Sequence, residues 1–575
     1  MNRHPARAQH IRWQVIIIAC GVALLATLLI YVALTFSTNT FPAKGGTYIE
    51  GMVGQPHAIN PLLCSFNEVD RDLCSLVFNG LLRLDAHGLP QPDLAARLPD
   101  ISPDGLVYTV TLRSDVRWQD GQPFTADDVI FTINLIKDPD FPGLGDLAEL
   151  WRTVEVSRVN AYNLAFTLQE PFAPFADYLT LGIVPAHALR NVPSADLASA
   201  DFNLRPIGTG PFKVQDIGDS GGQVEHVLLT ANTDYFGNQA YLDKIEIKFF
   251  ADDAAVFNAY RAGQVQGMAR VAYNDLPRLR QFPRLNVYSA PVAGYSLIFL
   301  NLSNPDVQFF QDKSVRQALS YALDRQKLVD QVLDGNGIVI PGPILPDTWA
   351  FDPASPAIRP DREKARALLD AAGWKIGGSG ASTPGVLDAA ALLPPDVRSK
   401  EGRVMGFSLL TSNDSYHLAM AKAVADQWAA IGVTVSVKSA PMLVTNFLAP
   451  RSYEAVLIDL SLTGDPDPYP FWHETQASGG QNFSGYEDRD MSELLEQARR
   501  TNDRNARFKF YQRFQTMFAD EAPALLLYQP VFTFAVDERV RGVQIGPLQT
   551  PSDRFRNVTD WYVVTRRVIV SNREP

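Results

Sequence analysis

The chain has 575 residues, too many for a single hydrophobic core, so we expect several domains or large lobes. Its composition, with 46% hydrophobic and 20% charged residues, excludes a collagen, a coiled coil and wholesale disorder. The net charge of -12 argues against a nucleic-acid partner, because no cluster of Lys and Arg is present to neutralise phosphates.

The N-terminus carries an uncharged apolar run over residues 15–36. At about 1.5 Å per residue, a helix of this length spans the roughly 30 Å hydrocarbon core of a membrane. Three arginines and no acidic residue precede the run, so the positive-inside rule assigns residues 1–14 to the cytoplasm. The sequence therefore predicts a single-pass anchor, with the bulk of the chain on the outer face of the cytoplasmic membrane.

A cleaved signal peptide is the alternative interpretation of this run. The apolar region of a signal peptide is normally about 7–15 residues long and ends in small residues. The present run is longer and ends in Leu34, Thr35 and Phe36. The tetrad Ile17–Cys20 is similar to a lipoprotein cleavage box, but most of the apolar run follows it. We therefore favour an uncleaved anchor.

The first part of the remaining chain alternates strand and helix patterns. Residues 37–46 are expected to be a linker. The following segment has a strand pattern over 106–112, a helix pattern over 127–136 and a strand-rich stretch over 224–250. This alternation predicts an α/β architecture.

The second part of the chain continues the same alternation. Helices are predicted over residues 312–333, with Asp312 as the N-cap, and over 361–372, 418–428 and 491–518. A strand is predicted over 433–437. Residues 376–404 are rich in Gly, Ser, Ala and Pro, which is typical of a flexible surface insertion.

Catalytic and metal motifs carry little weight in this sequence. The run Gly218–Gly222 matches a serine-nucleophile pattern, with Ser220 as nucleophile and His187 as the only upstream base in a suggestive setting. A Gly-rich hairpin turn explains the same residues better, because strand patterns flank it on both sides. The eight histidines show no metal-ligand spacing, and no phosphate-binding loop occurs, so no metal and no cofactor are expected.

Two of the three cysteines lie close together in the part of the chain expected outside the cell. Thiols oxidise in that compartment, so a Cys64–Cys74 disulfide is expected as a structural cross-link. Two buried free thiols are the alternative.

Seven segments carry a family resemblance. The segment WQDGQPFTADDV (118–129) describes by itself only a strand end, a tight turn and a helix capped by Thr125. The other six are NPLL (60–63), PIGTGPFKV (206–214), ANTDYFGNQAYLDKIEIKFF (231–250), FNAYRAGQVQGM (257–268), VRQALSYALDRQKLVDQVLDGNG (315–337) and REKARALLDAAGW (362–374). In order and spacing the seven segments resemble the family-5 bacterial extracellular solute-binding proteins, the dipeptide, oligopeptide and nickel-binding class of ABC importers. The resemblance covers residues 45 to about 564.

The resemblance implies a two-lobe periplasmic-binding-protein-like fold of the class II type, with an extra subdomain in lobe I. Lobe I would comprise residues 45–85, 205–288 and 528–567, and the subdomain residues 86–204. Lobe II would comprise residues 289–527. The chain would cross between lobes near 291–295 and 529–532.

The resemblance also implies a ligand site between the lobes. Asp465 matches the family position that pairs with the α-ammonium of a bound peptide, although Leu462 stands where the family usually has an aromatic residue. The alternative is that Asp465 caps a turn between prolines. The remaining residues expected to face the ligand are Ser65, Phe66, Asn67, Gly294, Tyr295 and Trp472.

The expected function is that of a monomeric substrate-binding component, which captures a solute by hinge closure and delivers it to a membrane permease without chemical change. A peptide is the first choice of ligand, followed by other solutes bound by this family, such as sugars, opines or metal chelates. The alternatives are a ligand-sensing ectodomain of a signalling partner and a serine hydrolase that uses Ser220.

Overall fold

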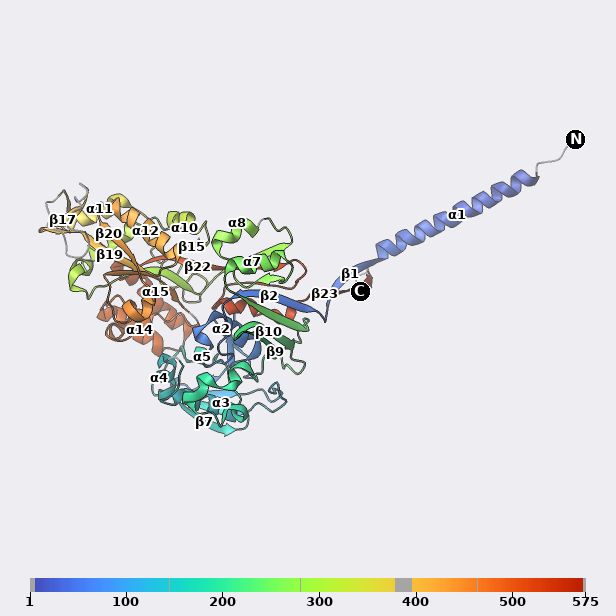
Figure 1. Cartoon of the computed structure of the whole chain (residues 1–575), viewed down its shortest axis with the longest axis horizontal. Coiled ribbons are helices and arrows are strands. Elements are labelled where there is room, and N and C mark those ends of the chain that lie inside the picture. The colour runs from blue at the N-terminus through green and yellow to red at the C-terminus, as the bar shows by residue number, and fades with distance from the viewer. Residues whose placement is uncertain (1–5, 144, 280, 378–395, 463, 572–575) are drawn as a thin grey trace.

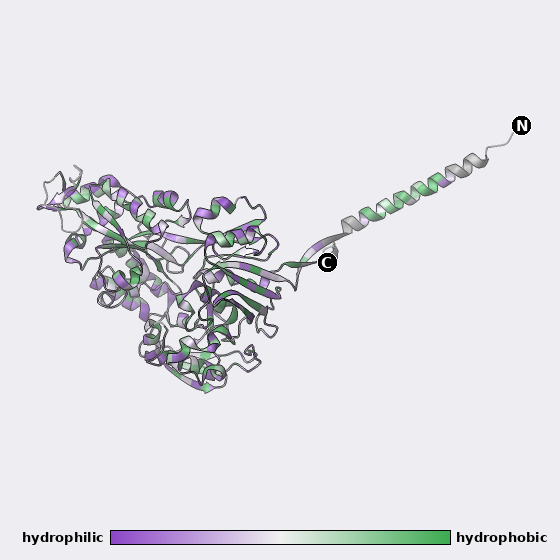
Figure 2. Cartoon of the chain, viewed as in Figure 1, coloured by the Kyte–Doolittle hydropathy of each residue, from purple (hydrophilic) through white to green (hydrophobic). Residues whose placement is uncertain are grey.

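The computed structural model describes residues 6–143, 145–279, 281–377, 396–462 and 464–571. A long helix, α1 (Ala6–Thr35), extends away from the body, and the C-terminus lies near its end (Figure 1). Residues Trp13–Tyr31 of α1 are fully exposed, long enough and apolar enough to cross a membrane. Figure 2 shows mostly apolar residues along this part of the helix.

The helix is joined to the body by a two-stranded ribbon. Strand β1 (Phe36–Ala43) pairs antiparallel with β23 (Val564–Ser571), so a segment near the N-terminus is hydrogen-bonded to a segment near the C-terminus. The segment 37–46 was expected to be a linker, and up to Ala43 it forms strand β1. Its partner strand lies more than 500 residues away, beyond the reach of any local pattern.

One mixed sheet runs through the body and is centred on the long strand β22 (Ala524–Asp537). Strands β2 and β11 pair in parallel, as do β19 with β20 and β21, whereas β22 pairs antiparallel with its neighbours. Its order is β20 (Thr434–Ser439), β19 (Gly406–Thr411), β21 (Ala455–Ser461), β14 (Gly294–Leu300), β22, β12 (Gly267–Met268), β2 (Thr47–Val53), β11 (Lys244–Phe250), β10 (Gln223–Ala231) and β9 (Phe212–Ser220), while β13 (Leu285–Pro291) and β15 (Gly337–Ile338) also pair with β22.

Buried apolar residues form two main cores that divide this sheet. The first core draws on residues 48–290 and 532–561, and the second on residues 293–528. We refer to the two parts as lobe I and lobe II. The predicted two-lobe α/β architecture is confirmed.

Lobe I includes a separate sheet in the order β5 (Asp100–Ile101), β6 (Val107–Thr111), β8 (Asn163–Thr167) and β7 (Glu155–Asn160), and the hairpin of β3 (Leu82–Leu84) and β4 (Pro90–Pro92). Its helices are α2 (Glu68–Val77), α3 (Ala126–Lys137), α4 (Gly145–Thr153), α5 (Phe175–Tyr178), α6 (Ala186–Leu189), α7 (Asp253–Arg261) and α8 (Leu276–Leu279). Thr125 and Asp128 form a reciprocal capping box at the start of α3, which explains why this helix begins where the sequence predicts.

The helices of lobe II are α9 (Lys313–Tyr321), α10 (Arg325–Val332), α11 (Arg362–Ala371), α12 (Ser415–Ala429), α13 (Tyr469–Trp472), α14 (Arg489–Arg500) and α15 (Arg504–Glu521). Two predicted helices are each divided in the structure. Asp324 and Asp503 accept hydrogen bonds from backbone N–H groups and start new helices, α10 and α15, within the predicted ranges 312–333 and 491–518.

The expected insertion at 376–404 is only partly described. Residues 378–395 lie outside the described part of the chain. The flanking residues form a small sheet of β16 (Lys375–Ile376), β17 (Arg398–Lys400) and β18 (Arg403–Val404). The guanidinium of Arg398 is buried and donates to Asp370 and to the carbonyl of Trp374, so this part of the segment is ordered by packing.

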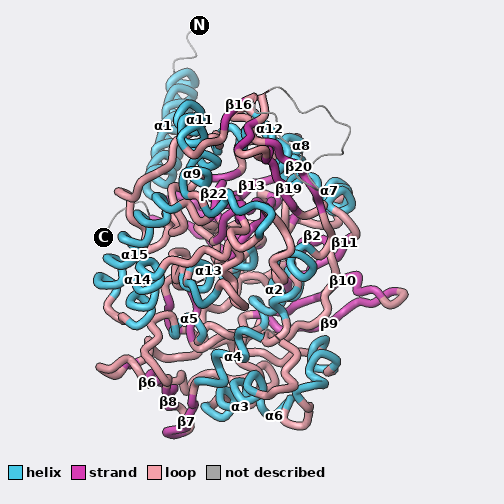
Figure 3. The backbone as a smooth tube through the Cα atoms, turned by 90° about the vertical axis from the view of Figure 1, so that its left-hand side faces the viewer, coloured by secondary structure: helices cyan, strands magenta, loops and turns pink. Residues whose placement is uncertain are grey.

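The Gly-rich run at 218–222 is the tip of the β9–β10 hairpin, which projects from the body (Figure 3). Gly221 and Gly222 adopt left-handed backbone conformations, with φ of 65° and 83°, which explains the glycine pair in the turn. Ser220 is exposed beside this turn, and the ring of His187 contacts Asp120 at 2.7 Å. The hairpin interpretation is confirmed, and the geometry gives no support to Ser220 as a nucleophile.

Candidate ligand-binding cleft

Two cavities lie between the lobes, and residues of both lobes line each of them. The main cavity has a volume of about 690 Å³, and the side cavity about 370 Å³. The main cavity is bounded on the lobe I side by the end of β2, by the start of α2 and by residues 269–275. On the lobe II side it is bounded by the start of α12, by Asp459 of β21 and by Tyr528 of β22.

The lobe II wall of the main cavity holds two carboxylates around one imidazole. Nδ1 of His417 lies 2.7 Å from the carboxylate of Asp414, and its Nε2 lies 3.5 Å from that of Asp459. The hydroxyl of Tyr416 donates to Asp459 and lies 2.9 Å from Nε2 of His417. These contacts fix the orientation of the Asp459 carboxylate at the end of an otherwise apolar strand.

The same contacts keep the Asp459 carboxylate charged. Burial alone would raise its pKa, but the hydrogen bond and charge of His417 outweigh burial and hold the pKa below its usual range. Burial would lower the pKa of His417, and the two neighbouring carboxylates raise it instead. A net negative charge therefore remains when one imidazolium faces two carboxylates.

The lobe I wall contains a buried ion cluster. The guanidinium of Arg554 donates to Glu50 and to Asp72 at 2.6 Å each, and the hydroxyl of Tyr48 donates to Glu50 at 2.6 Å. Arg554, Glu50 and Asp72 are all at most 2% exposed in their side chains. Because these buried charges satisfy one another, the cluster joins β2, α2 and the C-terminal segment.

The side cavity contains a second buried ion pair. The guanidinium of Arg507 binds both oxygens of Asp465, at 2.6 and 2.7 Å, and also donates to the hydroxyl of Tyr511. Nearby, Arg499 donates to Asp467 at 2.6 Å and stacks over the ring of Tyr469. The carboxylate of Asp465 is therefore already paired within the protein.

Direct contacts between the lobes lie beside the side cavity. The backbone N–H of Asp465, in lobe II, donates to the carboxylate of Asp177 on α5 of lobe I. The N–H of Gly464 donates to the side-chain oxygen of Gln549 at 3.0 Å. Burial, together with the negative charge of Asp465, raises the pKa of Asp177 to about 8. The two lobes are thus in direct contact at this point.

Known proteins share both this fold and much of the sequence. The model of the bacterial extracellular solute-binding proteins, family 5, matches residues 90–483. The chain belongs to this family. Relatives include the oligopeptide-binding protein AppA of Bacillus subtilis, with 30% identity over 91% of this chain and 92% of the relative. The family is one of solute-binding proteins of ABC importers and not of enzymes, as expected.

Solved structures agree with this assignment. The structure of AppA in complex with a nonapeptide superposes with a TM-score of 0.71 at 28% identity, covering 91% of this chain and all of that one. The structure of NikZ from Campylobacter jejuni with Ni(L-His) has a TM-score of 0.72 at 27% identity, covering 90% and 99%.

The residues expected from the family-5 resemblance fall in three different places. Leu462, Asp465 and Tyr295 line the side cavity, and Gly294 begins β14 next to it. Trp472 is instead buried in the core of lobe II, packed against Phe299 and Phe518.

The loop residues Ser65, Phe66 and Asn67 line neither of the two cavities among the described residues. Asn67 caps α2 by accepting from the N–H of Val69, which assigns it a structural role. The carbonyl of Ser65 accepts from Arg71, and the ring of Phe66 is 64% exposed. Glu68 and Arg71, just after this loop, do reach the main cavity.

Sequence reasoning missed the acidic wall made by Asp414, Tyr416, His417 and Asp459. One signal was present, since Asp459 is the only charged residue in the strand sequence AVLIDLS. A charge at the end of a buried strand is costly unless it has partners or a function.

The expected Cys64–Cys74 disulfide is absent, because both residues are free thiols in this structure. The Cys64 thiol contacts the carbonyl of Pro61, and Cys74 is buried on α2. Burial raises the pKa of the Cys74 thiol, and the neighbouring Cys64 thiol raises it further. The alternative of two free thiols therefore describes this structure.

Proposed function

We propose that this chain captures a peptide in the main cavity, by closure of its two lobes, and delivers it to a membrane permease. The supporting observation is a cavity of about 690 Å³ with walls from two separate cores. A ligand that touches both walls binds the closed form better than the open form, so it shifts the population toward closure. The complex of the relative AppA with a nonapeptide supports a peptide as the ligand class.

The two cores are the bodies that would move. Strand β22 pairs with β14 of lobe II up to Tyr528 and with β13 of lobe I from Val531. The chain crosses between the lobes a second time between β13 and β14. At this crossing, the N–H of Val292 donates to the carbonyl of Pro530 in β22 at 3.0 Å. The proposed lobe boundaries near residues 289 and 528 coincide with this crossing, and hinge motion is concentrated in such short connections.

The N-terminal helix would hold the receptor at the outer face of the cytoplasmic membrane. Its residues Trp13–Tyr31 are fully exposed, and the β1–β23 ribbon follows directly. We propose that residues 15–36 remain as an anchor, with residues 1–14 in the cytoplasm. Tethering would raise the effective concentration of the receptor near its permease.

Small-angle X-ray scattering combined with native mass spectrometry tests this proposal. The chain without residues 1–35, purified from its own host, is expected to carry peptides and to have a smaller radius of gyration than after their removal. A micromolar dissociation constant, about -8 kcal/mol, is sufficient to observe both states. A radius of gyration that no peptide mixture changes would contradict hinge closure, and co-purification of a non-peptide solute would contradict the ligand class.

The anchor requires its own experiment. In membranes from cells that express the full chain, the receptor should resist extraction by alkaline carbonate, and its first residues should be present in the mature protein. An N-terminus that begins after residue 36 would show cleavage and refute the anchor.

A further inference from the structure

The two walls of the main cavity differ in charge. On the lobe I side, the arginines Arg71, Arg270 and Arg554 are interspersed with the acids Glu68, Asp72, Asp253 and Asp275. Among the described residues that line it from lobe II, two are acidic and none is Lys or Arg: Leu333, Asn336, Asp414, Ser415, Tyr416, Asp459 and Tyr528. The lobe I wall is therefore mixed in charge and the lobe II wall is acidic, so a positively charged group in this cavity is attracted to the lobe II wall.

The acidic wall presents an oriented charge that its own partners do not neutralise. Asp459 accepts from Tyr416 and shares His417 with Asp414, so two carboxylates face one imidazole. The side chain of Asp459 remains 37% exposed, although its partners hold it in place. That exposed part can accept further hydrogen bonds from a ligand.

A buried hydroxyl next to Asp459 adds a second indication of a ligand. Ser296 of β14 lies directly opposite Asp459 in the strand pairing and opposite Tyr528 on its other side. Opposite residues of paired strands point to the same face, which here is the cavity face. Ser296 is fully buried, and its hydroxyl lies against Asp459 and Tyr528 without completing a well-formed hydrogen bond to either. A ligand group bound at Asp459 can complete the hydrogen bonding of this hydroxyl.

We propose that the acidic wall formed by Asp414 and Asp459 binds the cationic side chain of a Lys or Arg residue in the captured peptide. This inference rests on the proposed function and specifies its ligand as a basic peptide. The ammonium or guanidinium donates to the exposed oxygen of Asp459, in a cavity that the closed lobes shield from water. Charge-assisted hydrogen bonds in such a site are among the strongest in proteins.

The opposite wall fits the same ligand. Arg270 contacts Glu68 at 3.5 Å and is 62% exposed, so a peptide carboxylate can reach it from the cavity. A peptide with a basic side chain and a free C-terminus then contacts each lobe through a group of opposite charge. Both contacts exist together only in the closed form.

Isothermal titration calorimetry with one set of tetrapeptides tests the inference. The set contains a Lys peptide, its Nε-acetyl form, its Nα-acetyl form and an all-neutral peptide of the same length. The wild-type chain is expected to bind the Lys peptide about tenfold or more tightly than its Nε-acetyl form. Nα-acetylation should leave this preference intact, because the cation at Asp459 is the side chain.

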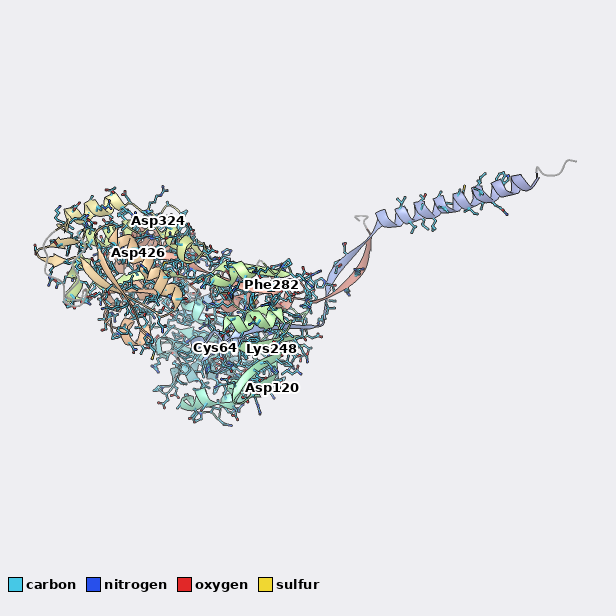
Figure 4. All side chains as sticks on the ribbon, turned by 45° about the horizontal axis from the view of Figure 1, so that its top comes forward. Cys64, Asp120, Lys248, Phe282, Asp324 and Asp426 are labelled. Carbon is cyan, nitrogen blue, oxygen red and sulfur yellow. The ribbon has the colours of Figure 1, made fainter. Side chains whose placement is uncertain are left out.

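The Asp459→Asn variant keeps the side-chain shape and removes the charge. We expect it to reduce the preference for the Lys peptide over its Nε-acetyl form to about twofold or less, and this ratio within one variant cancels any loss of affinity common to all peptides. Asp426→Asn is the matched control, because Asp426 is an exposed acid on α12 that pairs with Lys422 and does not line the main cavity (Figure 4). A melting temperature close to that of wild type shows that Asp459→Asn is folded.

The outcomes separate this inference from the proposed function. If neutral and basic peptides bind equally, peptide capture stands and the cationic site is refuted. If only Nα-acetylation removes the preference, the acidic wall binds the terminal ammonium, and the inference is also refuted. If no peptide binds, whatever its charge, the assignment of a peptide as the ligand is refuted together with the cationic site. If Asp459→Asn unfolds, the Nε-acetyl comparison on the wild-type chain still decides.

Discussion

Closure of the lobes should depend on pH through Asp177, and the substitution Asp177→Asn tests this. In the closed form, burial and the nearby charge of Asp465 raise the pKa of Asp177 from its ordinary value of 3.8 to about 8. When the lobes separate, Asp177 loses the contact with Asp465 and regains water. Its pKa then returns toward the ordinary value, so closure takes up a proton.

The direction of the effect follows from this difference. A carboxyl whose pKa is raised on closure favours the closed form at pH below 4, where it is protonated in both states. This contribution is lost progressively as the pH rises from about 4 to about 8. At about 1.4 kcal/mol for each pH unit, the full loss is about 6 kcal/mol. This value is an upper limit, because relaxation of the contact between the lobes reduces it.

Measurement of the ligand dissociation constant at several pH values between 5 and 8 is the appropriate assay. The wild-type chain should bind less tightly as the pH rises. Asp177→Asn should bind more tightly than wild type at pH 8, with a flatter profile, because the amide oxygen still accepts from the N–H of Asp465 and carries no charge. His417 titrates in both proteins, so the difference between the two profiles isolates Asp177. Parallel profiles for the two proteins would refute the reasoning.

Two further predictions concern stability. Arg554→Met should destabilise lobe I by about 3–5 kcal/mol, because it leaves two buried carboxylates without a cation. Arg489→Met should have a much smaller effect, because this arginine is 56% exposed and water screens its three carboxylate partners. Thermal unfolding measures both, and equal shifts in melting temperature would show that burial is not decisive. Removal of residues 564–575 should expose the segment Phe36–Ala43 to limited proteolysis without changing ligand affinity by more than about twofold, and removal of 572–575 alone is the control. Unchanged cleavage in the longer truncation would contradict the ribbon.

Local patterns predicted most of the elements, because their causes are local. The helix from Ala126 begins at a Thr–Asp capping box that lies within four residues of sequence. The divided helices show where the prediction failed. Apolar spacing continued through Asp324 and Asp503, and the prediction followed that spacing, although each aspartate could have been recognised as a second N-cap.

The site was less predictable, because its contacts join distant segments. The family resemblance led to Asp465, but the guanidinium that occupies its carboxylate comes from Arg507, 42 residues later. The acidic wall likewise combines the end of β21 with the start of α12. Sequence spacing contains no information on such encounters, and the strand pairing that creates them became visible only in the fold.

The continuity of β22 limits how this receptor can open. Its 14 residues belong to both lobes, so neither lobe can slide along the other without breaking the pairing on both sides. A rotation near Pro530 leaves the ladders with β13 and β14 intact and disturbs only the short contacts at the crossing, the pairing with β15 and the hydrogen bond from Val292. The receptor is therefore expected to swing through a single angle, so that a permease need only distinguish two orientations of the same rigid halves.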